Sequence, residues 1–379
     1  MNNFSFYNPT KIIFGKNRIT EIGKEIRNNN HKRILLLAGQ GSIKTNGVYD
    51  QITASLKENK IDFVEMWGVQ ANPTLEKVNE TIEFARKHDV DSILAVGGGS
   101  VIDSAKAVAV GFYLDDLWLF MQRKVQAKEA LPLYTVLTIS ATGSEMNSGF
   151  VITNSKTQQK WGGGSPLLFP RVSVIDPSIQ FSLPWDQTVN GGLDAIAHIL
   201  EYYFVDDKAI TTREIDKALI RTIISMVDRL QENPQDYSAR ANLAWSATLA
   251  LNGISGIGMN GGDWACHTIE HALSALHPKI AHGAGLGVIF PAWIEYMVFK
   301  YPEKFSDWFE IWGEDNSISA LISMRNKLRD WGSPVALRDL CIRKDELDKI
   351  ADKIMEFPVI GSFSKFTRED IESILILAY

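Results

Sequence analysis

The chain has 379 residues, 45% of them apolar, and a formal net charge of −6. This allows two domains with substantial cores and gives no electrostatic support for binding nucleic acid or an anionic membrane. No apolar run approaches the roughly 20 residues that span a bilayer, and the start MNNFSFYNPTKIIFG lacks the pattern of a secretory signal. The two cysteines cannot form a disulfide framework, so we expect a soluble cytoplasmic protein with no nucleic-acid or membrane partner.

The first half of the chain alternates short apolar segments with amphipathic ones. Strands that alternate with helices and are apolar throughout are typical of a parallel sheet covered on both faces. Polar residues and glycines at 153–166 indicate a loop or hairpin. The predicted strands are 32–39, 62–68, 92–100, 133–140 and 171–177, and the predicted helices are 48–59, 74–89 and 101–112.

After Leu183-Pro184 the alternation stops and helical patterns continue to the end of the chain. We therefore expect an α/β plus all-α fold, with a Rossmann-like parallel-sheet domain at 1–184 and an all-helical domain at 185–379. The predicted helices of the second domain include 186–205, 211–231, 237–255, 263–276 and 284–300.

One aspartate and several histidines in the second half indicate a metal site. Asp194 and His198 are four residues apart in a helical segment, which places both side chains on one face. His267 and His271 repeat this spacing, and His282 follows after a proline break. Carboxylate and imidazole groups are ligands that zinc and ferrous iron accept.

The first half of this pattern also has a simpler explanation. A lone Asp-x-x-x-His pair is more often a surface polar pair than a pair of ligands. The apolar residues around His267 and His271 favour the metal site, because bare imidazoles buried among them would cost free energy. His277 lies on another helical face, beside Pro278, and is interpreted as a helix-end residue.

Three loops at predicted strand ends are candidates for binding a dinucleotide, since ligands of parallel sheets gather at the carboxyl ends of the strands. Glycines let the backbone approach a pyrophosphate, although an isolated GGGS is equally consistent with a tight turn that binds nothing. The first loop has no acidic residue for a ribose hydroxyl, and Ser42 with Lys44 could accept a 2′-phosphate. The candidate residues are Gly39, Gly41 and Ser42 in the first loop, Gly97, Gly98, Gly99, Ser100 and Asp103 in the second, and Thr138, Thr142, Ser144 and Asn147 in the third.

Taken in order, these motifs resemble the iron-dependent (group III) alcohol dehydrogenases, and within them the NADP(H)-using aldehyde reductase and butanol dehydrogenase branch. The resemblance covers essentially the whole chain. It is carried by FYNPTKIIFGKNRI at the start, GGGSVID (97–103), ATGSEMN (141–147), DPSIQFSLP (176–184), GGLDAIAHILE (191–201), HTIEHALSALHPKIAHGAGLGVIFP (267–291) and LRDWGSPVALRDL (328–340).

The resemblance implies a dehydroquinate synthase-like fold, a homodimer, and hydride transfer between NADP(H), or NAD(H), and short- to medium-chain aldehydes or primary alcohols. It implies one Fe²⁺ or Zn²⁺ ion with Asp194, His198, His267 and His282 as ligands. His271 would be a non-ligand beside the substrate, acting as the proton donor or as an orienting residue. Lys160 would join the three loops in binding the cofactor.

Three other functions remain open on the sequence. The nearest is an NAD-dependent, zinc-containing polyol dehydrogenase of the glycerol type. A lyase like dehydroquinate synthase would need a basic pocket, whereas residues 255–300 contain only Lys279 and Lys300 as lysine or arginine. A non-enzymatic nucleotide-binding or scaffold protein would require the aspartate and histidine pattern to be coincidental.

Overall fold

The computed structural model of the chain describes residues 1–206 and 208–379. It forms two compact units, which we call the sheet unit and the helical unit. The sheet unit comprises Tyr7–Leu183 and Gln235–Ala244, and the helical unit comprises Met1–Phe6, Pro184–Pro234 and Trp245–Tyr379. The units differ from a simple division at residue 184 in two places. Residues 1–6 belong to the helical unit, and residues 235–244 belong to the sheet unit.

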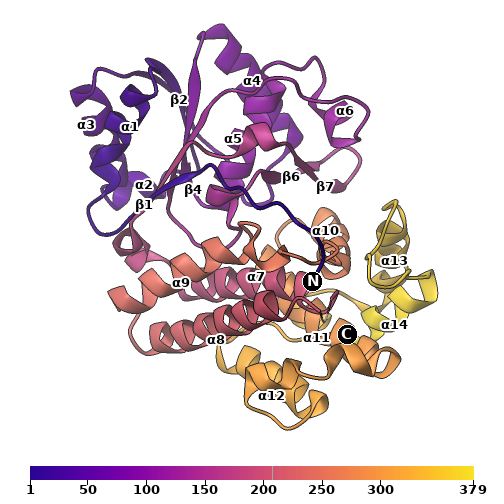
Figure 1. Ribbon diagram of the computed structural model, residues 1–379. Helices are drawn as coiled ribbons and strands as arrows, with labels where there is room; N and C mark the ends of the chain where they lie inside the picture. Colours follow the sequence, from indigo (N-terminus) through magenta and orange to yellow (C-terminus); the bar gives the residue numbers. More distant parts are fainter. Residues whose placement is uncertain (207) are drawn as a thin grey trace. The chain divides into compact units, whose positions relative to one another are not determined.

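The sheet unit is built on a six-stranded parallel sheet among the residues described, in the order β1-β8-β5-β4-β2-β3. Figure 1 labels three of these strands, β1, β2 and β4. Its strands are β1 (Lys11–Phe14), β2 (Arg33–Ala38), β3 (Asp62–Met66), β4 (Ser92–Gly97), β5 (Leu133–Leu137) and β8 (Val172–Ile175). The predicted strands at 62–68 and 92–100 end early. Gly68 has a φ of +94°, and α5 already begins at Gly99.

Alternating residues of the strands point to two separate cores. Ile34 and Leu36 pack on one face of the sheet with α1 and α3, whereas Leu35 and Leu37 pack on the other face with α4 and α5. Both faces are therefore covered, as the continuously apolar strands predict. The helices of this unit are α1 (Ile22–Asn28), α2 (Ser42–Thr45), α3 (Val48–Glu58), α4 (Leu75–Lys87), α5 (Gly99–Gly111) and α6 (Leu117–Met121).

The segment predicted as a loop or hairpin is a hairpin. Strands β6 (Gly149–Asn154) and β7 (Gln159–Gly164) form a separate antiparallel pair.

The chain order of the sheet creates a switch point between β2 and β4. The connection from β2 leads outward to β3, and the chain then crosses back to β4 and continues in the opposite direction to β5. The loop after β2 and the loop after β4 both leave the sheet at this point. Open parallel sheets bind ligands at such positions.

The helical unit contains the helices that were predicted after residue 184, apart from the first part of α9. Helix α7 packs against α8 and α11, and α11 also packs against α10, α12 and α14. The predicted helix at 237–255 ends earlier, because Gly253 adopts a φ of +103°. The helices are α7 (Trp185–Tyr203), α8 (Ile210–Glu232), α9 (Tyr237–Ala250, shared between the units), α10 (Ala265–Leu276), α11 (His282–Lys300), α12 (Ser317–Asp330), α13 (Leu347–Met355) and α14 (Arg368–Ala378). Within the described residues, no helix has the length and apolar character needed to cross a membrane.

Candidate functional site

Four side chains from three helices of the helical unit form a compact cluster. Asp194 and His198 lie on α7, His267 lies in the first turn of α10, and His282 is the first residue of α11. The first three are almost fully buried, and the His282 side chain is 23% exposed. The structure thus brings together the residues that the sequence analysis singled out from positions up to 88 residues apart (282 − 194).

The distances in this cluster fit a shared cation better than direct hydrogen bonds. Nε2 of His282 and Nε2 of His198 lie 3.6 Å and 3.7 Å from Oδ1 of Asp194, which is too long for hydrogen bonds. Two ligands bound at about 2.1 Å to one tetrahedral ion stand about 3.4 Å apart. Asp194, His267 and His282 also offer ligand atoms that all lie within 4.8 Å of one another.

Unsatisfied buried atoms support the same interpretation. Within the described part of the chain, Oδ1 of Asp194 and Nε2 of His267 are buried and have no hydrogen-bond partner. Such atoms cost free energy unless a ligand or an ion binds them. Burial lowers the pKa of His198 to about 3, so its imidazole is neutral and can act as a ligand. The donor set therefore fits a divalent metal ion.

His198 lies less close to the other ligand atoms than the remaining members of the cluster do. Its ring stacks on the His267 ring, with 4.8 Å between the centroids and 23° between the planes, and it is not part of the tight set formed by Asp194, His267 and His282. The indole of Trp264 lies against both rings, at centroid distances of 6.3 Å and 5.2 Å. An aromatic wall therefore covers one side of these imidazoles.

His271 is half-buried and lies one helical turn after His267. Its ring centroid is 6.2 Å from that of His267 and 5.4 Å from that of His282. His271, Glu270 and His282 form a second group of potential ligand atoms within 4.8 Å. His277, predicted to lie at a helix end, is the C-cap of α10, and its Nε2 lies 3.6 Å from Glu346.

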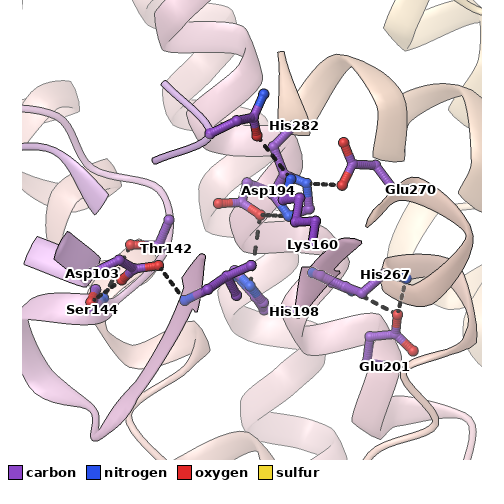
Figure 2. A network of polar contacts seen from close by, with 12 residues as sticks. Asp103, Thr142, Ser144, Lys160, Asp194, His198, Glu201, His267, Glu270 and His282 are labelled. Atoms are coloured by element: carbon purple, nitrogen blue, oxygen red, sulfur yellow. Dashed lines mark hydrogen bonds and ion pairs between the residues drawn. The ribbon is translucent and has the colours of Figure 1, made fainter. Parts of the chain in front are cut away.

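Two buried carboxylates that the sequence analysis did not single out contact the histidines. Glu201 of α7 binds Nδ1 of His267 at 2.7 Å, and Glu270 of α10 binds Nδ1 of His282 (Figure 2). Their sequence signal was the spacing His-x-x-Glu, which occurs at 198–201 and again at 267–270.

In the sheet unit, close packing accounts for the glycines of the second loop. Gly97 ends β4 and Gly99 begins α5. A Cβ atom on Gly98 would lie 2.2 Å from Cγ2 of Ile139, and one on Gly99 would lie 2.4 Å from Cγ2 of Thr142. The glycines thus let the third loop approach the start of a 13-residue helix, whose first N–H groups have no partner within the helix.

Asp103, Ser144 and Asn147 belong to a buried network inside the sheet unit. Asp103 accepts hydrogen bonds from Ser144 Oγ at 2.7 Å and from the Val151 N–H at 2.9 Å (Figure 2). Nζ of Lys106 donates to Ser144 Oγ at 2.8 Å, to Asn147 Oδ1 at 2.9 Å and to the Gly149 carbonyl at 2.8 Å. These side chains fix the loop from within. Lys106 was missed, although a lysine and an aspartate three residues apart on an apolar helix were visible in the sequence.

The remaining candidates differ in their exposure to solvent. Thr138, Thr142 and Ser100 are half-buried, and Ser42 is exposed after Gly41, which has a φ of +118°. Lys160 is buried on β7, and its Nζ donates to Oδ1 of Asn72 at 2.9 Å.

Comparison with known proteins identifies the family. The model of the iron-containing alcohol dehydrogenases matches residues 9–177, and the model of the C-terminal part of the same family matches residues 188–379. The chain belongs to the iron-containing alcohol dehydrogenase family. It is an oxidoreductase of alcohols and aldehydes that uses a nicotinamide cofactor and a metal, and the predicted fold class is confirmed.

Relatives match over nearly the full length. The crystal structure of NADH-dependent butanol dehydrogenase A from Thermotoga maritima is 49% identical and has a TM-score of 0.97, covering 100% of this chain and 99% of that one. Probable NADH-dependent butanol dehydrogenase 2 from Bacillus subtilis is 41% identical, covering 99% of each chain. An NADPH-dependent aldehyde reductase from Escherichia coli is 34% identical, covering 94% of each.

Proposed function

We propose that this enzyme reduces short- to medium-chain aldehydes, or oxidises the matching primary alcohols, at a single divalent metal ion held by Asp194, His198, His267 and His282. The observation that carries the proposal is the pair of distances of 3.6 Å and 3.7 Å between Oδ1 of Asp194 and the two imidazole nitrogens. Three neutral imidazoles and one carboxylate would leave about one unit of positive charge at the ion.

In this mechanism the metal, when bound, supplies a Lewis acid for the substrate oxygen, and the nicotinamide supplies or accepts the hydride. The helical unit provides the ligands and, through Trp264, an aromatic wall beside them. His271 would deliver the proton to the substrate oxygen during reduction, directly or through a water or a cofactor hydroxyl. The alternative is that His271 only orients the substrate.

For the cofactor, we propose that Gly97, Gly98, Gly99 and Ser100 bind the pyrophosphate at the start of α5. Thr138 and Thr142, which are half-buried, would line the site, and Lys160 would contribute its charge. Asp103, Ser144 and Asn147 would act by holding the third loop in place, because they are bound to one another and to Lys106.

We propose NADP(H) as the preferred dinucleotide, with Gly39, Gly41 and Ser42 at the 2′-phosphate. The support is an exposed Ser42, a nearby Lys44, and no carboxylate between residues 39 and 44. Nζ of Lys44 lies 4.0 Å from the Trp67 ring, so the lysine would have to leave this ring to reach a phosphate. The butanol dehydrogenases named above are NADH-dependent, which makes NAD(H) the alternative. The ratio of kcat/KM for NADPH and NADH decides between them.

The metal site is tested with His198→Ala and Asp194→Asn. Both variants should lose the metal and turnover, while the far-UV circular dichroism spectrum of the protein keeps its wild-type shape. Removing the metal with a chelator and restoring Fe²⁺ or Zn²⁺ separately would identify the active ion. A metal-free His198→Ala variant with normal aldehyde reduction would contradict the proposal.

A polyol dehydrogenase is the second candidate, because a 1,3-propanediol dehydrogenase of Citrobacter freundii is 29% identical over 365 residues. Butanal with NADPH and NADH, compared with glycerol and 1,3-propanediol with NAD⁺, separates the two functions. Faster turnover of the polyols would favour the second candidate.

We also propose a homodimer. Phe4, Phe6 and Tyr7 expose 54%, 45% and 78% of their surface, and exposed aromatic side chains close together are typical of an interface. Light scattering should give a molar mass near twice that of the chain, and a monomer would contradict this.

A further inference from the structure

The metal-facing histidines are held by carboxylates at repeated positions in the sequence. Glu201 follows His198 by three residues on α7, and Glu270 follows His267 by three residues on α10. Glu201 binds His267 on α10, and Glu270 binds His282 on α11 (Figure 2). Each carboxylate therefore reaches from one helix to the histidine of the next.

Glu201 caps the start of α10 and also binds the His267 side chain. Its Oε2 accepts the Trp264 N–H at 2.5 Å, and its Oε1 accepts the His267 N–H at 3.0 Å and Nδ1 of His267 at 2.7 Å. Trp264 occupies the N-cap position with a φ of +64° and provides no side-chain cap. Glu201 thus takes the place of a capping side chain, although it lies on another helix.

These contacts fix the tautomer of His267. Both oxygens of Glu201 already accept backbone N–H groups, so the carboxylate is also the acceptor in its contact with Nδ1 of His267. Nδ1 of His267 must therefore carry the proton, which leaves the lone pair on Nε2. This is the buried nitrogen that has no hydrogen-bond partner among the described residues.

Glu270 holds His282 in the same way. The carboxylate is fully buried, and its Oε2 binds Nδ1 of His282. Nε2 of His282 then faces Oδ1 of Asp194 at 3.6 Å. A Cβ atom on Gly285 would lie 2.8 Å from Cγ of Glu270, so the glycine leaves room for the carboxylate beside α11.

We propose that Glu201 and Glu270 are positioning residues that link α7, α10 and α11 into one metal-binding frame. Each carboxylate directs Nε2 of the next helix's histidine toward the ion and makes that nitrogen a stronger ligand. Together with Asp194 they place three negative charges around a divalent ion, which favours its retention. This inference rests on the metal site proposed above, because it concerns how that site is oriented.

The experiment measures metal affinity rather than activity. Metal-free protein is titrated with Zn²⁺ against a competing chelator, and with Co²⁺ while its visible absorption spectrum reports the ligand geometry. Glu201→Gln and Glu270→Gln should each weaken Zn²⁺ binding by about 10- to 100-fold. Asp216→Asn is the matched control, because Asp216 is a buried carboxylate of α8 whose oxygens form no hydrogen bond with the site histidines in the described part of the chain. The control should bind Zn²⁺ as the wild type does.

Glu201→Asp and Glu270→Asp separate position from charge. Aspartate keeps the negative charge but is shorter by one methylene group, so its carboxylate no longer reaches the imidazole. We expect weaker Zn²⁺ binding and a changed Co²⁺ spectrum in both variants. If both aspartate variants bind like the wild type, charge alone is sufficient and the positioning role is wrong. Because Glu201→Gln also removes a helix cap, Glu270→Gln gives the result if the former does not fold.

A His267→Ala variant distinguishes this inference from the proposed function. If His267→Ala loses the metal while all glutamate variants keep wild-type affinity and spectrum, the metal site stands and the positioning role is overturned. If His267→Ala also keeps the metal, the site itself is misassigned.

Discussion

Helix α11 approaches α7 so closely at Gly283 that a single methyl group should disturb the metal site. A Cβ atom at this position would lie 2.1 Å from the Asn190 carbonyl oxygen and 2.7 Å from its carbon. Asn190 lies one helical turn before Asp194, and Gly283 directly follows His282. The obstacle is backbone, which cannot rotate away as a side chain can. Gly283→Ala must therefore move α11 away from α7.

The displacement follows from the contact distance. Cβ atoms essentially never approach other heavy atoms closer than 3.0 Å, so the helices must separate by about 0.9 Å. Added to the distance of 3.6 Å between His282 Nε2 and Asp194 Oδ1, this gives about 4.5 Å, compared with about 3.4 Å for two ligands of one tetrahedral ion. We expect Zn²⁺ binding at least tenfold weaker, and turnover with saturating metal lower by about 100-fold.

Gly287→Ala is the control on the same helix. Its Cβ would meet Cδ1 of Leu193 at 3.0 Å and Oγ of Ser333 at 3.3 Å, both of which are the ends of side chains that can move. Replacing glycine by alanine in a helix is otherwise favourable by about 1 kcal/mol. Chelator competition should give wild-type Zn²⁺ affinity for Gly287→Ala. Wild-type affinity and turnover in Gly283→Ala would refute the reasoning.

Three further outcomes are expected. His271→Ala should lower turnover while the metal stays bound, and loss of the metal would make His271 a ligand. Lys106→Met removes the donor of three hydrogen bonds that hold the third loop, and it should weaken dinucleotide binding measured by fluorescence without changing Zn²⁺ affinity. Unchanged dinucleotide affinity would contradict its role in the loop. Burial raises the pKa of Asp263 from 3.8 to about 7, so its contribution to stability is present below pH 3.8 and is lost as the pH rises through 7, by about 4 kcal/mol at most. The stabilising effect of Asp263→Asn on metal-free protein should therefore grow between pH 5 and pH 8, and a constant difference in thermal unfolding would disprove it.

The fold class could be predicted because its sequence signals are local. Strands such as 33–38 and 92–97 have no polar side chain after their first residue, and helices such as 75–87 carry a stripe of apolar residues, so both follow from short-range patterns. The hairpin at 149–164 was harder to predict. Its strand Gln159–Gly164 has three consecutive glycines, and Trp161 is its only residue of a type enriched in strands.

Only part of the candidate metal site could be predicted from the sequence. The pair Asp194 and His198 obeys the four-residue rule of a helix, so its common face could be read from the sequence. Glu201 looked like an ordinary polar residue in the same helix, because its partner His267 is 66 residues away. Nothing local indicates which histidine a buried carboxylate will contact.

The sequence by itself determined the family, the alternation of strands and helices, and the identity of the aspartate and histidines that face one another. Local patterns and ordered motifs are sufficient for these features. The tertiary structure decided which helix supplies the carboxylate for each imidazole, which nitrogen of His267 is free, and where α11 meets the backbone of α7. These features depend on how three helices pack, and packing is set by contacts between residues that are distant along the chain.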